Sequence, residues 1–248
     1  MNKTIDTILS HRSIRKFKEE KLTTEQIHLL VKAAQQASTS SYVMAYTIIG
    51  INGMETKEEL RNISGHPHVT NNGHLFIFCA DLHRVQLICS EKEKQQMQES
   101  IESTEQFIVS TIDAALAAQN LSIAAESMGL GICYLGSMRN DIHRVNDLLH
   151  LPEHVVPLFG LAVGYPDQEP EIKPRFPLDV VYHENKYTED VEQRKFLADF
   201  DEELKEYYQN RSENRRIDTW KEQMIRKYKK AQRMDVSTFV QNKKLNRR

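Results

Sequence analysis

Apolar and polar positions follow helical spacing in some segments of the 248-residue chain and strand spacing in others. Apolar residues three or four positions apart predict amphipathic helices, at the N-terminus and over 22–39, 56–64 and 139–152. Apolar runs of strand length predict strands over 45–51, 74–81, 132–136 and 155–166. The run at 74–81 does not alternate, which is typical of a strand in a sheet covered on both faces. The mixture predicts an α/β or α+β fold.

The segment 110–131 is the longest stretch with little charge, and it is rich in small residues. It predicts a central helix buried on nearly all sides and ended by Gly129 and Gly131. The charged, Gln-rich segment 91–105 predicts a helix or an excursion from the body. A Pro-rich segment over 167–182 predicts extended chain, and two or three charged helices follow it.

Composition narrows the class of protein. The chain is 40% hydrophobic with a net charge of −2, so it can bury a sizeable core and bulk charge favours no partner. Residues 211–248 nevertheless carry 13 Lys and Arg against 4 Asp and Glu. Three cysteines without metal-ligand spacing support neither a disulfide scaffold nor a zinc site. A polar N-terminus and short apolar runs favour a cytoplasmic protein without a membrane partner.

Local catalytic motifs are missing from the chain. It has no nucleophile elbow, HExxH, Walker loop or GxGxxG. Gly129, Gly131 and Gly136 stand in the order helix, glycines, strand, which is the reverse of the dinucleotide-binding order. An enzyme-like core without catalytic groups favours chemistry supplied by a cofactor.

Three basic clusters and one hydroxyl cluster suggest an anion site. "HRSIRKF" spans 11–17, Arg139 follows a predicted strand, and Lys173 and Arg175 flank a proline. "ASTSSY" supplies adjacent hydroxyls over 38–41. Guanidinium groups match phosphate, and hydroxyls suit a polyol chain. Each cluster taken alone is more typical of a solvated surface than of a site, and the clusters gain weight only together.

The order of these motifs resembles one known family. "HRSIRKF", "ASTSSYVMAYTIIGI", "FIFCADLHR", "DAALAAQNLSIAAESMGLGICYLGSMRND", "LPEHVVPLFGLAVGYP", "KPRFP", "HENKY" and "ENRRIDTW" follow one another along almost the whole chain. The chain resembles the FMN-dependent, oxygen-insensitive nitroreductase and flavin reductase family, in its larger NADPH-preferring group. The resemblance implies an α+β fold of three layers, with a mainly antiparallel central sheet flanked by helices. It also implies an intertwined homodimer with two FMN molecules at the subunit interface.

The resemblance assigns residues to each part of that site. An FMN-binding core over 1–188 and a helical arm over 189–248, which wraps the dimer and contributes to NADPH binding, are expected. The residues expected to bind FMN are His11, Arg12, Ser13, Arg15, Ser38, Thr39, Ser40, His66, His68, Tyr134, Leu135, Gly136, Ser137, Arg139, Lys173 and Arg175. Those expected to bind NADPH are Arg211, Arg215 and Arg216. No metal is expected. The family usually has Gln-x-Tyr-Val where this chain has His66-Pro67-His68-Val69.

The implied reaction is ping-pong hydride transfer from NADPH through FMN to nitroaromatics, quinones, azo compounds or free flavin. Negative charge on the reduced ring is stabilised by a nearby cation, and Arg15 is the candidate. A second hypothesis is a dedicated reductase that supplies reduced flavin. Two further hypotheses are a redox-inactive flavin-binding module and a nucleic-acid-binding module. The nucleic-acid-binding module is disfavoured because aromatic stacking motifs are absent, so no nucleic-acid partner is expected.

Overall fold

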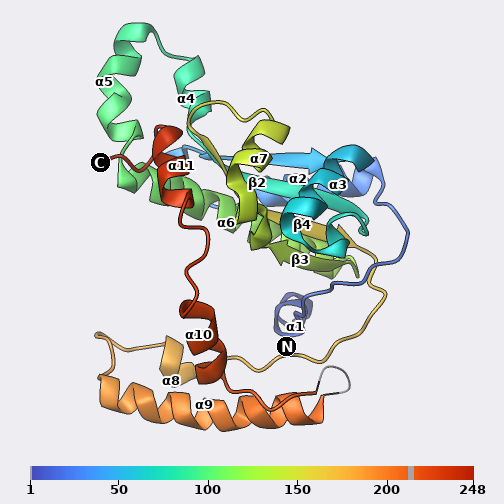
Figure 1. The fold of residues 1–248 in the computed structure, drawn as a ribbon. Coiled ribbons are helices and arrows are strands. Elements are labelled where there is room, and N and C mark those ends of the chain that lie inside the picture. Colours follow the sequence, from blue (N-terminus) through green and yellow to red (C-terminus); the bar gives the residue numbers. More distant parts are fainter. Residues whose placement is uncertain (1, 212–214) are drawn as a thin grey trace. The chain divides into compact units, whose positions relative to one another are not determined.

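The computed structural model describes residues 2–211 and 215–248. The chain forms two compact units (Figure 1), each described by itself. The first comprises Met1–Pro170 with Arg233–Arg248, and the second comprises Glu171–Gln232. The division of the chain into a core over 1–188 and an arm over 189–248 stays a prediction.

The first unit is built on a four-stranded antiparallel sheet, as expected. Its strands are β1 (Tyr46–Ile51), β2 (His74–Asp81), β3 (Gly131–Leu135) and β4 (Val155–Gly164), in the order β1-β2-β4-β3. Every residue of β2 is buried, as its uninterrupted apolar run predicts.

Helices cover both faces of this sheet. They are α1 (Lys3–Leu9), α2 (Thr24–Gln35), α3 (Met54–Ser64), α4 (His83–Leu87), α5 (Glu91–Ile101), α6 (Thr104–Ser127), α7 (Ile142–Leu148) and α11 (Val236–Asn242). Three short 3-10 turns each lie between a helix and a strand along the chain: η1 (Ser40–Tyr42), η2 (Pro67–Val69) and η3 (Gly136–Asp141).

Alternate residues of β2 divide the core into two layers. Phe76 and Phe78 pack in one cluster with buried residues of α2 and α6. Leu75 and Ile77 pack in the other cluster with buried residues of α3 and α7. Because side chains alternate across a strand, this arrangement gives the expected three layers.

The prediction that α6 is buried on nearly all sides was wrong. Ile108, Ile112 and Leu116 are 47%, 50% and 43% exposed, and they lie four residues apart on one face. A helical pattern shows which side chains are apolar and leaves open what covers them. By length and composition α6 could also span a membrane, although the sequence pattern indicated no run that long. It packs against β2 and α2 and buries Asp113, as a core helix does.

The second unit holds α8 (Leu178–Val181), α9 (Asp190–Asn210) and α10 (Trp220–Tyr228). Its small core joins Phe200, Leu204 and Tyr208 of α9 to Phe176 and Trp220. A capping box between Thr219 and Glu222 fixes the start of α10. The Pro-rich segment is extended up to Pro177, but α8 then interrupts the predicted extended chain.

Candidate functional site

Residues 11–17 run beside β3 as an extension of the sheet. Ser13 pairs with Ile132 in a parallel bridge, and the Ile14 amide donates to the Ile132 carbonyl over 2.9 Å. Ile14 and Phe17 are buried. Main-chain pairing and two buried apolar side chains therefore fix the segment in place.

Two glycines allow this pairing. Gly129 has φ 77° at the end of α6, a conformation that glycine adopts without strain. A Cβ on Gly131 would lie 2.5 Å from Cγ1 of Ile14, closer than any real contact allows. The sequence pattern indicated both glycines as the end of the helix, and Gly131 also makes room for Ile14.

Arg15 and His68 line a cleft of about 520 Å³. Arg15 is exposed and forms no ion pair with any residue that the structure describes. His68 is buried in η2, and its ring stacks on that of His66, with 5.2 Å between centroids. Burial, followed by the charges of His66 and Arg15, lowers the pKa of His68 to about 4. The cleft therefore presents an unpaired cation beside a neutral imidazole.

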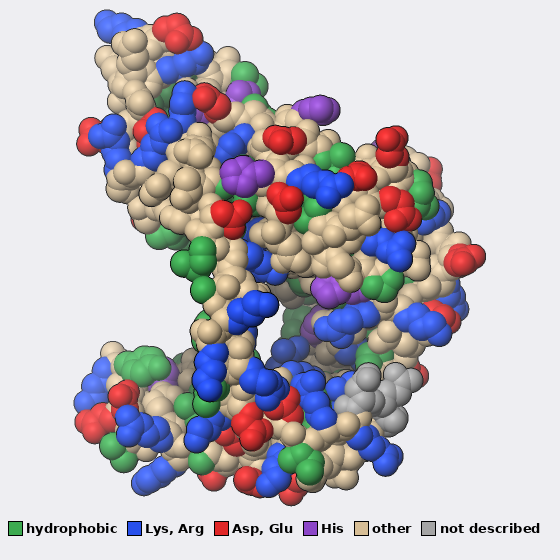
Figure 2. Space-filling model, viewed as in Figure 1, with side chains coloured by type: hydrophobic (Ala, Val, Ile, Leu, Met, Phe, Trp, Pro, Cys, Tyr) green, Lys and Arg blue, Asp and Glu red, His purple; other side chains and the backbone are tan. Residues whose placement is uncertain are grey.

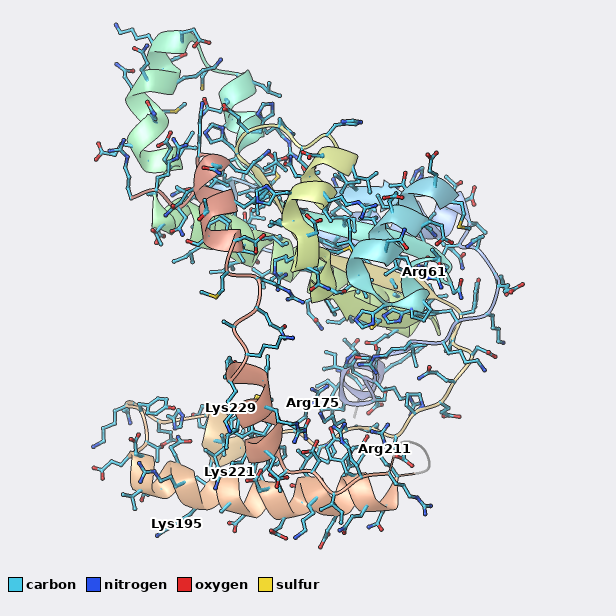
Figure 3. All side chains as sticks on the ribbon, viewed as in Figure 1. Arg61, Arg175, Lys195, Arg211, Lys221 and Lys229 are labelled. Atoms are coloured by element: carbon cyan, nitrogen blue, oxygen red, sulfur yellow. The ribbon has the colours of Figure 1, made fainter. Side chains whose placement is uncertain are left out.

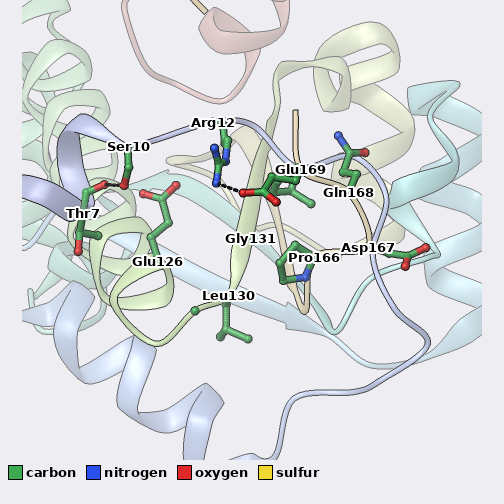
Figure 4. A pocket seen from close by; sticks show the side chains of 12 residues that line it. Thr7, Ser10, Arg12, Glu126, Leu130, Gly131, Pro166, Asp167, Gln168 and Glu169 are labelled. Atoms are coloured by element: carbon green, nitrogen blue, oxygen red, sulfur yellow. Dashed lines mark hydrogen bonds and ion pairs between the residues drawn. The ribbon is translucent and has the colours of Figure 1, made fainter. Parts of the chain in front are cut away.

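His11 and Arg12 each face a carboxylate. His11 Nδ1 lies 2.6 Å from Glu126 Oε1, and an Arg12 Nη lies 3.1 Å from Glu169 Oε1. Figure 4 shows Arg12, Glu126 and Glu169 in the cavity of about 480 Å³ that they help to line. The Glu169 side chain is 83% exposed, so its pair with Arg12 is weak and can be exchanged for a ligand.

The end of β3 and the turn η3 carry five of the expected flavin residues, and the protein already holds three of their side chains. The Tyr134 hydroxyl lies 3.0 Å from Ser122 Oγ, and Ser137 Oγ lies 2.6 Å from Ser64 Oγ. Arg139 donates to the Leu158 carbonyl. Leu135 is buried, and Gly136 lies beside the Arg139 guanidinium. Ser137 and Arg139 therefore shape this segment from within.

Residues 38–41, the hydroxyl loop, are held in place by a residue that the sequence alone did not single out. Asp113 of α6 accepts hydrogen bonds from the amides of Ser40 (3.1 Å) and Ala45 (3.0 Å). Ser38 and Thr39 precede this anchor. No hydrogen bond or ion pair among the described residues joins the loop to the cleft of Arg15. An acid among apolar residues, away from both ends of the helix, is the signal that could have identified Asp113.

Three cations surround the buried Tyr208 in the second unit. Arg216 lies 4.1 Å from the ring centroid (guanidinium carbon), Lys173 lies 5.5 Å from it (Nζ), and Arg211 lies 5.7 Å from it (guanidinium carbon). All three lie within cation–π range. Burial raises the pKa of Tyr208, but interactions with Lys173 and Arg216 outweigh burial and lower it. Tyr208 and its cations make a preformed basic cluster that local motifs did not reveal.

This cluster has donors without acceptors. Arg211 Nε and Gln223 Nε2 are buried and unpartnered among the residues that the structure describes. Arg216 pairs with Asp218 at 3.2 Å. Unsatisfied buried donors are costly, and an anion would satisfy them. The cluster therefore fits a phosphate group.

The two remaining predicted cations, Arg215 and Arg175, do not belong to the cluster around Tyr208. Arg215 turns back, and its Nε donates to the Arg211 carbonyl over 3.0 Å. Arg175 is exposed and has no ion pair in the described part of the chain. Figure 3 labels Arg175 and Arg211 in the second unit, and Figure 2 shows Lys and Arg side chains on its viewed face. Among the described residues, no group of three His, Cys, Asp or Glu side chains could hold a metal ion.

Comparison with known proteins finds relatives that match this chain over nearly its whole length. FMN reductase (NADPH) of Bacillus subtilis (strain 168) is 50% identical over 249 residues, covering all of both chains. The solved structure of NfrA1 from B. megaterium superposes with a TM-score of 0.96 at 49% identity, covering 99% of this chain and 100% of that one. The NADPH:FMN oxidoreductase from Vibrio harveyi, solved with NAD+, gives 0.87 at 34% identity, covering 100% of both chains.

Two family models also match the sequence. The nitroreductase family matches residues 8–165, and the C-terminal domain of the nitroreductase family matches residues 173–248. These ranges include the extended segment beside β3, the cleft of Arg15 and the basic cluster around Tyr208. The chain belongs to the nitroreductase family.

Proposed function

We propose that this chain is an NADPH-dependent oxidoreductase with FMN as its cofactor. Its relative over the full length is named FMN reductase (NADPH). The observation that carries the proposal is the pairing of residues 11–17 with β3, which holds the unpaired Arg15 beside the neutral His68. An unpaired cation at a polar cleft fits an electron-accepting ring that gains negative charge. Three free cysteines are consistent with a reducing cytoplasm.

FMN, when bound, accepts hydride from NADPH and passes reducing equivalents to a second substrate. The residues of the protein serve to bind FMN and to polarise its ring. Arg15 supplies positive charge, and neutral His68 adds no competing charge beside it. In the first unit, Arg12 is the proposed cation for the FMN phosphate. Lys173 and Arg175, which the resemblance also assigns to FMN, stay predictions, since Lys173 lies in the cluster around Tyr208. Ser38, Thr39 and Ser40, whose loop Asp113 anchors, are proposed to meet the polyol chain.

The basic cluster around Tyr208 is the proposed site for the 2′-phosphate of NADPH. Arg211 and Arg216 lie against the same ring, and Arg211 Nε lacks an acceptor among the described residues. Arg215, whose Nε donates to the Arg211 carbonyl, is the third residue proposed to bind NADPH. NADH lacks the 2′-phosphate, so this site discriminates between the two nucleotides.

A homodimer is part of the proposal. Ile108, Ile112 and Leu116 leave one face of α6 exposed, and α1, which lies against α6, exposes Ile5 and Ile8 as well. An apolar face of this kind marks an interface. The absence of hydrogen bonds and ion pairs between the hydroxyl loop and the Arg15 cleft within the described chain also favours a site that two subunits complete.

We propose ping-pong transfer to electron-poor acceptors, such as nitroaromatics, quinones, azo compounds or free flavin. A dedicated flavin reductase is the second candidate, because a relative bears that name. Steady-state rates with NADPH at several fixed concentrations of each acceptor test both. Parallel double-reciprocal lines with several acceptor classes support the broad enzyme. Turnover with free flavin alone supports the dedicated reductase, and no NADPH oxidation with any acceptor would reject both.

A further inference from the structure

Helix α3 carries a lysine whose burial its sequence does not predict. Residues 56–64 read as a helix with a polar face, but Lys57 is only 3% exposed. Its Nζ donates to Asn72 Oδ1 over 3.0 Å, and no ion pair with Lys57 occurs among the described residues. Burying an ammonium without a carboxylate costs stability, so the position calls for a compensating role.

Asn72 connects Lys57 to the turn that carries His66 and His68. Its Nδ2 donates to the carbonyls of His68 (2.8 Å) and Val69 (2.9 Å). Two carbonyl acceptors require the amide nitrogen on that side, so Oδ1 faces the Lys57 ammonium. Lys21 Nζ donates to the Asn72 carbonyl over 3.0 Å. The Asn72 side-chain amide thus closes the turn over 66–72 through its nitrogen, and Lys57 of α3 holds its oxygen.

The opposite end of α3 holds a second loop. Ser64 and Ser137 are both buried, and their hydroxyl oxygens lie 2.6 Å apart. Asn140 Nδ2 donates to the Ile63 carbonyl over 3.3 Å. Helix α3 packs against both η2 and η3. One helix therefore contacts two of the three short turns that carry expected flavin residues.

We propose that Lys57 and Ser64 are positioning residues of the flavin site, Lys57 fixing the turn over 66–72 and Ser64 fixing the turn over 136–141. Neither side chain belongs to the residues that the family resemblance assigns to FMN. Each turn is built on a single short 3-10 helix, so its geometry depends on such supports as well as on its own main-chain hydrogen bonds. The part of the inference that concerns FMN rests on the proposed function.

The test compares Lys57→Met and Ser64→Ala with Arg61→Met. Arg61 lies on the same helix, is exposed, and pairs only with Glu58 among the described residues (Figure 3). Amide hydrogen exchange is measured in the protein without FMN. Lys57→Met is expected to speed exchange over 66–72 about tenfold, the effect of one lost hydrogen bond, while 136–141 is unchanged. Ser64→Ala is expected to speed exchange over 136–141 alone, and Arg61→Met over neither segment.

The second readout is the affinity for added FMN. A support displaced by about 1 Å weakens function by up to about 100-fold, so both variants are expected to bind FMN at least about tenfold more weakly than Arg61→Met. Faster exchange spread evenly over the chain, or unchanged exchange in both turns, would overturn the inference. If Lys57→Met does not fold, Ser64→Ala, which removes only one hydroxyl, still tests whether α3 positions the turns. If the wild-type protein binds no FMN, the proposed function is wrong. The hydrogen-exchange rates would still test whether Lys57 and Ser64 position the two turns.

Discussion

The guanidinium carbon of Arg216 lies 4.1 Å from the centre of the Tyr208 ring, and the same ring lies within cation–π range of Lys173 and Arg211. Tyr208 is buried among Phe200, Leu204 and its other core neighbours, so it cannot follow a mobile cation. The ring holds the cations in place before a ligand arrives. Preorganisation of this kind lowers the cost of binding an anion.

Arg216→Ala and Arg211→Ala are expected to raise the KM for NADPH by about 10- to 100-fold, because each removes a charge-assisted hydrogen bond to the 2′-phosphate. The KM for NADH is expected to change little. Lys221→Ala is the matched control, since it removes one positive charge from α10, in the same unit. Steady-state kinetics with both nucleotides measure the effect. An equal rise for NADPH and NADH would contradict the phosphate site.

His68 and His74 are expected to remain neutral between about pH 5 and 8, the range in which ordinary histidines titrate. Burial, followed by nearby positive charges, lowers the pKa of each from 6.5 to about 4. NMR titration of the histidine rings measures this directly. Midpoints near 6.5 would show that the turn over 66–72, for His68, and the start of β2, for His74, are open to water.

The same shift makes stability depend on pH. The unfolded chain binds protons on these rings below pH 6.5, whereas the folded chain binds them only near pH 4. Stability is therefore lost as the pH falls from 6.5 towards 4. Urea unfolding of wild type and His68→Gln at pH 7 and pH 5 tests the sign. The loss on acidification is expected to be smaller in the variant, and an equal loss would contradict the shift at His68.

Asp113→Ala is expected to destabilise the protein by about 2–4 kcal/mol, because it removes two hydrogen bonds from backbone amides to a buried carboxylate. It is also expected to weaken FMN binding, since the loop with Ser40 loses its anchor. Ser110→Ala, at another buried polar position of α6 whose hydroxyl donates to the Phe107 carbonyl, is the control for stability alone. Unchanged FMN affinity in a folded Asp113→Ala protein would remove the hydroxyl loop from the site.

Ile112→Asp is expected to convert the dimer to monomer, because it places a charge in the middle of the exposed apolar face of α6. Met54→Asp is the matched control, since Met54 is also exposed and lies in the first turn of α3. Light scattering after gel filtration gives the mass of each species. A wild-type protein that elutes as a monomer, or an Ile112→Asp protein that stays dimeric, would contradict this interface.

The sequence predicted elements whose signals are local. Helix α2 lies within the predicted segment 22–39, where Thr23 and Gln26 form a capping box, and β2 spans the predicted residues 74–81. The cluster over 11–17 was recognised as chemically unusual. Its attachment to β3 was not predicted, because the partner Ile132 is distant in sequence.

Long-range polar contacts account for most of what the sequence did not reveal. Asp113 meets Ser40 across 73 positions, and Ser64 meets Ser137 across another 73. Lys57 looks like one more charged residue on a polar helix face until Asn72 is placed beside it. The exposed face of α6 was predicted to be core because interface and interior residues share the same apolar pattern.

An anaerobic absorption spectrum of the protein supplied with FMN tests the central claim most directly. After removal of unbound FMN, we expect an oxidised-flavin band that NADPH bleaches faster than NADH does, and that an added quinone restores. A protein that retains no flavin, or a bound flavin that NADPH leaves oxidised, would contradict the assignment of Arg15, His68 and the Tyr208 cluster to an NADPH-dependent FMN oxidoreductase.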